Sequence, residues 1–164
     1  MNGTSSISKK ILALCGFLFL VLLIEYGGHY FTMSSVGDWY HTLKKPSWNP
    51  PSWVFGVAWT ILYIMIAISG WLIFIKVRPS TARGAAFVFY GFQLFCNFLW
   101  TYFFFFLKNP GLGLLDIFVL LILIGKNIVD FAKLNKIAAA LLIPYFFWTL
   151  YASSLNLAIW ILNR

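Results

Sequence analysis

Charged residues are scarce in this chain of 164 residues. Asp, Glu, Lys and Arg together make up 10% of it, and only four of these residues are acidic, whereas an average soluble domain is about 25% charged. Hydrophobic residues make up 62% and aromatic residues 21%, and the mean hydropathy is +0.86. This composition excludes a soluble domain and indicates an integral membrane protein.

Residues that carry conventional catalysis or bind metals are also few. The two cysteines, Cys15 and Cys96, lie inside apolar runs, so we interpret them as packing residues. The two histidines, His29 and His41, are isolated, which favours a solvated or interfacial role. The sequence contains no Ser-His-Asp pattern, glycine-rich phosphate loop or pair of intramembrane carboxylates. We therefore expect no metal, no cofactor and no acid-base or nucleophilic catalysis.

The net charge of +8 has two interpretations, nucleic-acid binding or orientation in a membrane. The basic residues are thinly spread at the ends of apolar runs, which favours orientation and argues against nucleic acid as a partner. With the amino terminus in the cytoplasm, eight basic residues lie on that side and four on the other, which predicts an N-in, C-out topology. The eight are Lys9, Lys10, Lys76, Arg78, Arg83, Lys126, Lys133 and Lys136, and the four are Lys44, Lys45, Lys108 and Arg164.

Apolar runs bounded by charges and prolines predict a five-transmembrane-helix bundle in a single domain, residues 1–164. Each run reaches the roughly 20 residues that cross the hydrocarbon core as a helix. The helices are expected near residues 8–30, 50–76, 84–107, 110–131 and 136–162. Lys9 and Lys10 before the first run resemble the start of a signal peptide, but no small-residue cleavage site follows, so we expect a retained helix.

The first connection, residues 31–49, is the only long one in this prediction. Four of the eight tryptophans lie between Trp39 and Trp59, in the segment WYHTLKKPSWNPPSWVFGVAW. So much rigid, amphipathic surface at a membrane boundary suggests a lid over a ligand. Asn49 is expected to cap the second helix, with Pro50 and Pro51 in its first turn, where a missing N–H does no harm.

The helix near residues 84–107 has two opposed special faces at about 100° per residue. Gly84 and Gly91 lie on one face, and small residues let helices approach closely in lipid, so this face is a candidate homodimer contact. Gln93, Asn97 and Trp100 lie on the other face. Amides in hydrocarbon need hydrogen-bonding partners, which leaves two interpretations: bonds that hold the helices together, or one wall of a ligand pocket.

Two other helices carry aromatic stripes at helical spacing. The stripes contain Trp59 and Tyr63 in the second helix, and Trp148, Leu155 and either Tyr151 or Ala152 in the fifth. Such a stripe is more often core packing than a binding wall, and both interpretations stay open. Asp116 falls in the second turn of the fourth helix, where the helix dipole favours an acidic residue, and we expect it to give structural support.

Several segments share their residues with one family. They are Trp39-Tyr40 followed by KPSWNPPSWVFGVAWTILY, Asn97 and Trp100 in the third helix, GLGLLD at the start of the fourth, and LLIPYFFWTLYASSLNLAIW in the fifth. Together they resemble the translocator protein family, whose members are also called tryptophan-rich sensory proteins or peripheral benzodiazepine receptors. The resemblance covers residues 39–160, and the KPSW-x-PP-x-W block is highly specific.

The resemblance implies a protein that binds porphyrins such as protoporphyrin IX, isoquinoline and benzodiazepine drugs and, in some members, cholesterol. It also implies a cavity beneath the first loop, between the first, second, third and fifth helices. The implied loop residues that close over the ligand are Trp39, Tyr40, Pro46 and Trp48. The implied wall residues are Asn97, Trp100, Ala152 and Leu155, beside Tyr63 and Gln93 from the faces described above. Trp59 and Trp148 match the tryptophans linked to light-dependent porphyrin breakdown in bacterial members.

One departure from the family pattern bears on the ligands. Sterol-binding members carry a Leu-x-Tyr-x-Arg-like pattern at the end of the fifth helix. This chain has there Leu155, Asn156 and Leu157, followed only later by Trp160 and Arg164. The missing tyrosine counts against cholesterol as a ligand, and the pattern is a weak signal even where it is complete.

Three functions are compatible with these observations. The first is a membrane receptor or transport protein for porphyrins and similar flat apolar ligands, in tetrapyrrole handling or stress signalling. The second is a light-driven, porphyrin-degrading enzyme that uses Trp59 and Trp148. The third is a structural protein whose aromatic residues form lipid-facing belts, which the specific first-loop block disfavours. The sequence leaves open whether the membrane is bacterial or the mitochondrial outer membrane.

Overall fold

A computed structural model describes residues 6–164 as a bundle of helices. Its elements in chain order are α1 (Ile7–Val36), α2 (Trp39–Thr42), α3 (Ser52–Lys76), α4 (Thr81–Thr101), the π-helix η1 (Tyr102–Phe106), α5 (Pro110–Leu134) and α6 (Lys136–Leu162). Five spans, with α4 and η1 counted as one, are long and apolar enough to cross a membrane. The prediction of an all-α, multi-pass integral membrane protein with five spans is therefore confirmed.

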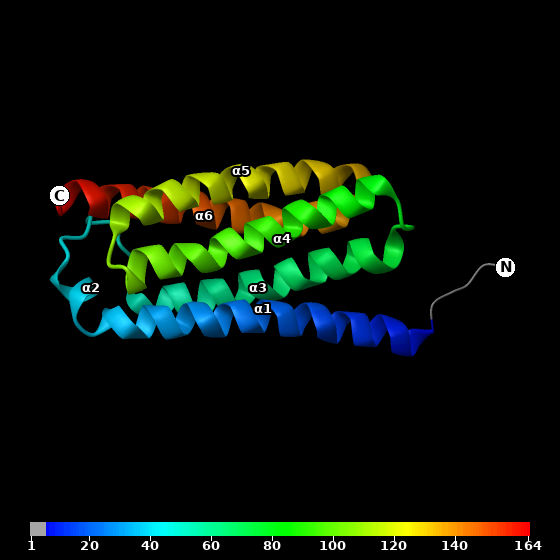
Figure 1. The fold of residues 1–164 in the computed structure, drawn as a ribbon, viewed down its shortest axis with the longest axis horizontal. Coiled ribbons are helices and arrows are strands. Elements are labelled where there is room, and N and C mark those ends of the chain that lie inside the picture. Colours follow the sequence, from blue (N-terminus) through cyan, green and yellow to red (C-terminus); the bar gives the residue numbers. More distant parts are fainter. Residues whose placement is uncertain (1–5) are drawn as a thin grey trace.

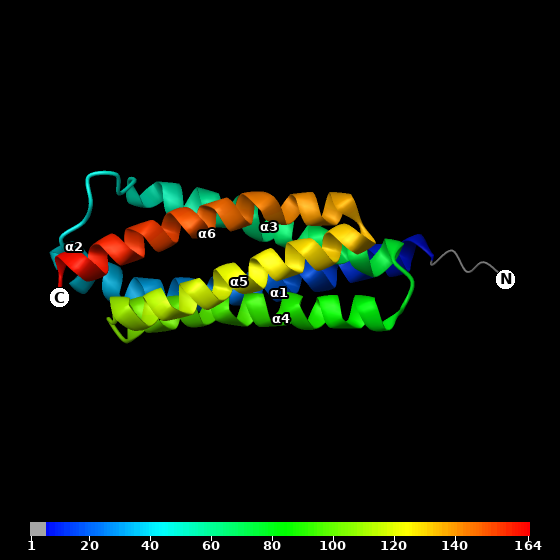
Figure 2. The same cartoon turned by 90° about the horizontal axis from the view of Figure 1, so that it is seen from above.

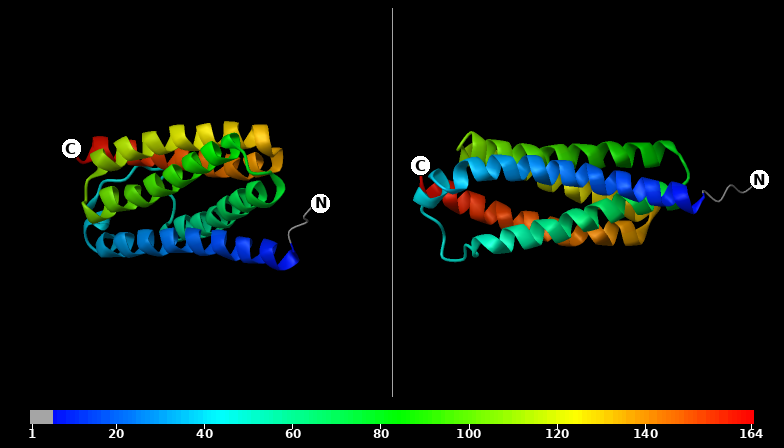
Figure 3. Two further views of the ribbon diagram at one scale, coloured as in Figure 1. Left: turned by 45° about the vertical axis from the view of Figure 1, so that its right-hand side comes forward. Right: turned by 90° about the horizontal axis from the view of Figure 1, so that it is seen from below.

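The five spans form a ring in which neighbouring helices are antiparallel, except α1 and α4, which run in the same direction (Figures 1 and 2). In this ring α1 contacts α3 and α4, α3 contacts α6, α6 contacts α5, and α5 contacts α4. The first loop, the α4–α5 turn and the carboxyl terminus lie at one end of the bundle, which we call the loop end (Figure 3). The start of α1 and the α3–α4 and α5–α6 turns lie at the opposite end.

The bundle is apolar outside and holds polar side chains inside. Leu12 and Ile122 on the surface are 73% and 72% exposed, as suits side chains that face lipid instead of water. Gln93, Asn97 and Asn127 are 3% exposed or less. Since a polar group in hydrocarbon needs a partner, the polar residues turn toward neighbouring helices and the aliphatic ones turn toward lipid.

The first helix is longer than the sequence indicates, because α1 continues to Val36 instead of ending near residue 30. Its last turns pack against the η1 segment. The ring of Phe31 lies 5.3 Å from those of Tyr102 and Phe106, and the hydroxyl of Ser35 donates to the carbonyl of Phe105 at 2.6 Å. These contacts stabilise two further turns of helix, so the loop between α1 and α3 is shorter and contains the single turn α2.

The predicted cap of the second span by Asn49 is wrong. The α3 helix begins at Ser52, and Pro51 occupies the cap position, where no side chain bonds to the helix. The Asn49 side chain instead accepts from the Tyr40 hydroxyl at 3.4 Å and donates to the carbonyl of Pro50 at 3.1 Å. Pro51 also restricts the residue before it to extended backbone, so Pro50 lies outside the helix.

The third span changes its winding near the loop end. The backbone N–H of Leu107 donates to the carbonyl of Tyr102 at 2.9 Å, five residues earlier, which defines the π-turn η1. Phe104 and Phe105, both in η1, are 2% and 9% exposed. Inserted π-turns re-aim the side chains that follow them. Here the turn presents two adjacent phenylalanines to the interior under the first loop.

Two adjacent glycines of α1, Gly27 and Gly28, allow the close approach of α1 and α4. A Cβ added to Gly27 would lie 2.6 Å from the ring of Phe98, which is closer than any real contact, and one added to Gly28 would lie 3.3 Å from the hydroxyl of Thr101. Small residues allow such backbone proximity between helices in lipid. Gly84 and Gly91 differ, because an added Cβ at either meets nothing within 4 Å.

Candidate functional site

Four side chains from three helices form a cluster in the middle of the bundle, which we call the interior cluster: Tyr63, Asn97 and Tyr145, which are buried, and Trp59, which is half-buried. The Tyr63 hydroxyl donates to Oδ1 of Asn97 at 2.5 Å, and Nδ2 of Asn97 donates to the Tyr145 hydroxyl at 3.1 Å. The ring of Trp59 lies 5.5 Å from that of Tyr63 and 6.1 Å from that of Tyr145. The cluster joins α3, α4 and α6 through one amide.

Other polar groups inside the bundle have no hydrogen-bonding partner among the described residues. Gln93 lies one helical turn before Asn97 and is 1% exposed, and both atoms of its side-chain amide are unpartnered. The indole Nε1 of Trp148, the hydroxyl of Thr149 and one carboxylate oxygen of Asp116 are also buried without a hydrogen-bonding partner. Most buried polar atoms in proteins are hydrogen-bonded, so each of these groups calls for an explanation.

Trp148 connects the α3–α6 contact to the first loop. Its ring meets that of Phe55 edge-on at 5.9 Å, one turn along α3 from Trp59, and lies 5.6 Å from the ring of Tyr151. The Tyr151 hydroxyl in turn donates to the backbone carbonyl of Trp48 at 2.8 Å. The two tryptophans predicted to act on a ligand are therefore about one helical turn apart on the α3–α6 interface.

Aromatic residues of the first loop pack onto the phenylalanines of η1. Trp39 meets Phe104 edge-on at 5.7 Å, and Tyr40 lies 5.6 Å from Phe105. Burial raises the pKa of Tyr40, and its hydrogen bond to Asn49 acts in the opposite direction. Because the net shift is upward from a value near 10, the hydroxyl stays protonated at neutral pH and remains a donor.

The same loop is tied to the end of α6. The backbone N–H of Lys44 donates to Oδ1 of Asn163 at 2.9 Å, and Nδ2 of Asn163 donates back to the carbonyl of Lys44 at the same distance. Pro46 is buried, whereas the side chain of Trp48 is 55% exposed. Trp48 therefore contacts α6 through its carbonyl while much of its ring faces outward.

Trp100 links the loop end to α6. Its indole donates to Oδ1 of Asn156 at 3.0 Å, and its ring stacks on Phe104 at 5.2 Å. Nδ2 of Asn156 donates to the carbonyl of Pro110 at 2.7 Å. Ala152 and Leu155 are buried on α6, 5% and 4% exposed.

Six of the twelve site residues predicted from the sequence fall into two connected groups. Tyr63 contacts both Trp59 and Asn97, and Trp100 reaches Trp39 and Tyr40 through Phe104. Trp48 is the most peripheral of the predicted residues.

Three functional candidates were missed in the sequence: Tyr145, Asn156 and Phe104. Tyr145 lies three residues before Trp148 on α6, and Asn156 lies four residues after Ala152, so both lie at helical spacing from predicted residues, at the edge of the predicted stripe. Phe104 carries no distinguishing signal among four consecutive phenylalanines.

The two amides of α4 separate the alternatives left open by the sequence. Asn97 is fully engaged between Tyr63 and Tyr145, as expected for a residue that holds helices together. Gln93 has no such bond. The described residues include no group of three His, Cys, Asp or Glu side chains that could hold a metal ion.

The fold and these contacts define a class: an integral membrane protein of five spans with aromatic and amide side chains buried between its helices and a first loop that packs its aromatic residues on one end of the bundle. Comparison with known sequences identifies the family within this class. The chain belongs to the TspO/MBR family, whose sequence profile matches residues 17–161. The resemblance read from the KPSWNPPSW segment is thereby confirmed.

Relatives from distant organisms span most of the chain. The tryptophan-rich protein TspO of Archaeoglobus fulgidus is 42% identical over 154 residues, which cover 94% of this chain and 99% of that protein. The tryptophan-rich sensory protein of Cereibacter sphaeroides is 35% identical over 85% of this chain and 87% of its own length. The human translocator protein is 31% identical over 74% of this chain and 73% of its own length.

Proposed function

We propose that this protein binds porphyrins, such as protoporphyrin IX, and similar flat apolar ligands beneath the first loop, between α1, α3, α4 and α6. The observation that carries this proposal is the set of unpartnered polar groups inside the bundle. Both amide atoms of Gln93 and the indole Nε1 of Trp148 are buried without a hydrogen-bonding partner. Leaving such a group unpaired costs about 1–3 kcal/mol. A ligand with its own donors and acceptors offsets that cost.

The aromatic content of the same region favours a flat ligand. Trp59 already lies against Tyr63 and Tyr145, and Trp148 lies against Phe55 and Tyr151. Stacked or edge-on aromatic pairs contribute about 0.5–1.5 kcal/mol beyond burial of their area. A planar macrocycle offers a larger face than any of these side chains. Isoquinoline and benzodiazepine-type molecules share that property, and cholesterol, which is not planar, is not proposed.

The first loop is proposed as the lid of this site. Its contacts with Phe104, Tyr151 and Asn163 are hydrogen bonds and aromatic contacts at the edge of the bundle. Such contacts separate without exposing a large core, as a lid requires. The names of two relatives, a sensory protein and a translocator protein, accord with a role in sensing or transport. For this chain we propose tetrapyrrole handling or stress signalling.

A second candidate function is light-driven breakdown of the bound porphyrin. It is favoured by the position of Trp59 and Trp148 within about one helical turn of each other on the α3–α6 interface. Indole stacks on flat ligands and takes part in photochemical electron transfer. Binding and breakdown therefore call for the same two residues, and only an experiment with light separates them.

The test is a titration followed by illumination. Purified protein in detergent is titrated with protoporphyrin IX while tryptophan fluorescence is recorded, and the absorption spectrum is then followed under light. Wild type is expected to show saturable quenching. Trp59→Phe and Trp148→Phe are expected to weaken binding about 2- to 10-fold each, which corresponds to the loss of about 0.5–1.5 kcal/mol of aromatic contact.

Trp53→Phe is the matched control, because Trp53 is at the start of α3 and 70% exposed. It should bind as wild type does. Absence of saturable quenching in wild type would remove both candidate functions. Quenching without any tryptophan-dependent spectral change under light would leave binding and remove breakdown.

We also propose that the protein forms a homodimer through the Gly84 and Gly91 face of α4. Both glycines are exposed, and an added Cβ at either would meet nothing within 4 Å. This face is thus open to a second helix, and small residues favour such contacts in lipid.

A further inference from the structure

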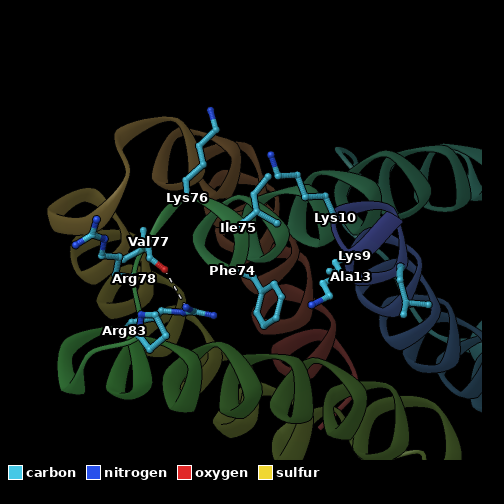
Figure 4. A pocket seen from close by; sticks show the side chains of 11 residues that line it. Lys9, Lys10, Ala13, Phe74, Ile75, Lys76, Val77, Arg78 and Arg83 are labelled. Atoms are coloured by element: carbon cyan, nitrogen blue, oxygen red, sulfur yellow. Dashed lines mark hydrogen bonds between the residues drawn. The ribbon is translucent and has the colours of Figure 1, made fainter. Parts of the chain in front are cut away.

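Five basic side chains gather at the end of the bundle opposite the first loop (Figure 4). They come from three parts of the chain: Lys9 and Lys10 in the first turns of α1, Lys76 at the end of α3, and Arg78 and Arg83 in the turn to α4 and its first residues. Together with apolar neighbours they line an open pocket of about 580 Å³. This basic pocket is distinct from the interior cluster and the first loop.

None of the five cations has an acidic partner among residues 6–164. The ion pairs at this end of the bundle join Asp130 of α5 to Lys126 and Lys133. The other acidic residues are Glu25, Asp38 and Asp116, and none of them lines the pocket. The positive charge of the pocket is therefore not neutralised by the described part of the protein. An anion entering it meets several uncompensated cations at once.

The pocket is also held in shape by its own contacts. The guanidinium of Arg83 donates to the carbonyl of Val77 at 2.8 Å and lies over the ring of Phe74, 4.9 Å from its centroid. The indole of Trp71 donates to the carbonyl of Lys10 at 2.9 Å, which joins the start of α1 to α3. The Arg83 side chain is thus oriented in advance, and an arginine has further N–H donors to offer a phosphate.

The remaining wall of the pocket is apolar and open to lipid. Leu12 and Phe74 line it, and their side chains are 73% and 47% exposed. In a membrane-spanning helix such exposed apolar side chains face hydrocarbon. The pocket therefore combines a cationic part at the membrane surface with an apolar part that continues into the bilayer, which matches a phospholipid better than a soluble phosphate.

From this combination we propose that the basic pocket binds the phosphate group of an anionic phospholipid, with the acyl chains lying along α1 and α3. The eight-to-four distribution of basic residues predicts that this end lies on the cytoplasmic side, where anionic lipids attract basic segments. Orientation alone requires only that the charges lie on that side. It does not require that five of them converge on one pocket or that Arg83 is held over Phe74.

The test is native mass spectrometry of the detergent-solubilised protein with phosphatidylglycerol or phosphatidylcholine as the added lipid. Wild type is expected to retain phosphatidylglycerol selectively. The triple variant Lys9→Gln, Lys10→Gln and Lys76→Gln should bind it roughly 100-fold more weakly, since each of the three basic residues near a membrane surface contributes about a fivefold factor. The matched control, Lys44→Gln, Lys45→Gln and Lys108→Gln, loses the same charge at the loop end and should bind as wild type does.

A second variant keeps every charge and therefore the orientation signal. Ala13 lines the pocket, and Ala13→Phe fills part of it. It is expected to reduce retention of phosphatidylglycerol with no effect on protoporphyrin IX binding. Equal retention by both triple variants together with unchanged retention by Ala13→Phe would overturn the proposal, as would equal retention of the two lipids by wild type. Displacement of phosphatidylglycerol by millimolar inorganic phosphate would assign the pocket to a soluble anion and also overturn it.

Discussion

Two amides one helical turn apart on α4 meet different surroundings. Asn97 accepts from Tyr63 and donates to Tyr145, so it joins three helices. Gln93 is equally buried and bonds to nothing among the described residues. Both are polar residues on the same face of an apolar helix. From this difference in partners we infer that Asn97 supports the bundle, whereas Gln93 is the amide available to the ligand in the proposed function.

Replacing each of these amides by leucine is expected to have opposite consequences. Asn97→Leu leaves two buried tyrosine hydroxyls without their partner and should lower the free energy of unfolding by about 1–3 kcal/mol. Gln93→Leu removes a group that is already unpaired, so stability should be unchanged or higher, while binding of protoporphyrin IX weakens. Thermal unfolding in detergent and fluorescence titration measure the two effects.

Each variant serves as the control for the other, because both place the same side chain on the same face of α4. Equal losses of stability would contradict the assignment of Asn97 as the supporting amide. Unchanged porphyrin affinity in Gln93→Leu would contradict a ligand-binding role for Gln93.

The first loop is the element whose behaviour depends most on a few contacts. It is joined to α6 by the reciprocal bonds between Lys44 and Asn163 and by the bond from Tyr151 to Trp48. Its aromatic residues lie on η1. The loop thus packs on the π-turn of the third span and is hydrogen-bonded to the end of α6.

Asn163→Ala is expected to weaken the attachment of the first loop to α6. The substitution removes both hydrogen bonds to Lys44, each of net worth about 0.5–1.5 kcal/mol, so the Lys44 amide should exchange with solvent roughly tenfold faster or more. Hydrogen exchange measured by mass spectrometry over residues 37–49 reports this change. Faster dissociation of protoporphyrin IX should accompany it if the loop is the lid.

Ser154→Ala is a suitable control on the same helix. The hydroxyl of Ser154 is exposed and bonds only to the carbonyl of Tyr151 within α6. Exchange in the loop should be unaffected by it. An Asn163→Ala protein whose Lys44 amide exchanges at the wild-type rate would show that the loop is held by its aromatic contacts instead.

The outer surface of the whole molecule is apolar, as suits contact with lipid, and it includes the face of α4 that we propose as a dimer contact. Large apolar side chains such as Val88 and Phe95 are more than half exposed, at 54% and 56%, along the same helix that carries Gly84 and Gly91. At the two glycines the backbone of α4 is exposed between these large side chains. Association through such a face draws on packing and not on the hydrophobic effect, because lipid is as apolar as the side chains.

Gly91→Leu is expected to shift the protein from dimer to monomer. Gly16→Leu on α1 is the matched control, because Gly16 is also exposed and an added Cβ there meets nothing within 4 Å. Neither substitution disturbs the packing of one chain, so folding should be preserved in both. Light scattering of the detergent-solubilised proteins measures the oligomeric state. A dimer that survives Gly91→Leu would exclude this face of α4.

The sequence predicted the elements better than their ends and contacts. Runs of apolar residues between charges identify five spans, because crossing the hydrocarbon core imposes the same demand on each segment. Asn49 illustrates the failure. Its type and its place before two prolines are typical of a helix cap, yet its side chain is engaged by Tyr40 from another part of the loop. Nothing within the segment reports that competition.

The sequence likewise predicted some residues of the candidate site and missed others. Trp59, Tyr63 and Asn97 are recognisable from helical spacing, since residues on one face must share an environment. Tyr145, which completes the cluster, was missed because it lies at the edge of the stripe predicted on α6 and not along its centre. That Asn97 is satisfied and Gln93 is not depends on which tyrosines from α3 and α6 come within reach, and helical spacing within α4 carries no information about that.

The sequence by itself determined that this protein is an integral membrane protein, that it has five membrane spans and that it belongs to the TspO/MBR family. These are properties of composition and of short segments, each of which must satisfy its own backbone in lipid. The tertiary structure alone decided the order of helices in the ring, the partners of each buried amide and the convergence of five cations from three segments on one pocket. The physical reason is that partners and convergence depend on which helix faces meet, and that is settled only when distant parts of the chain pack together.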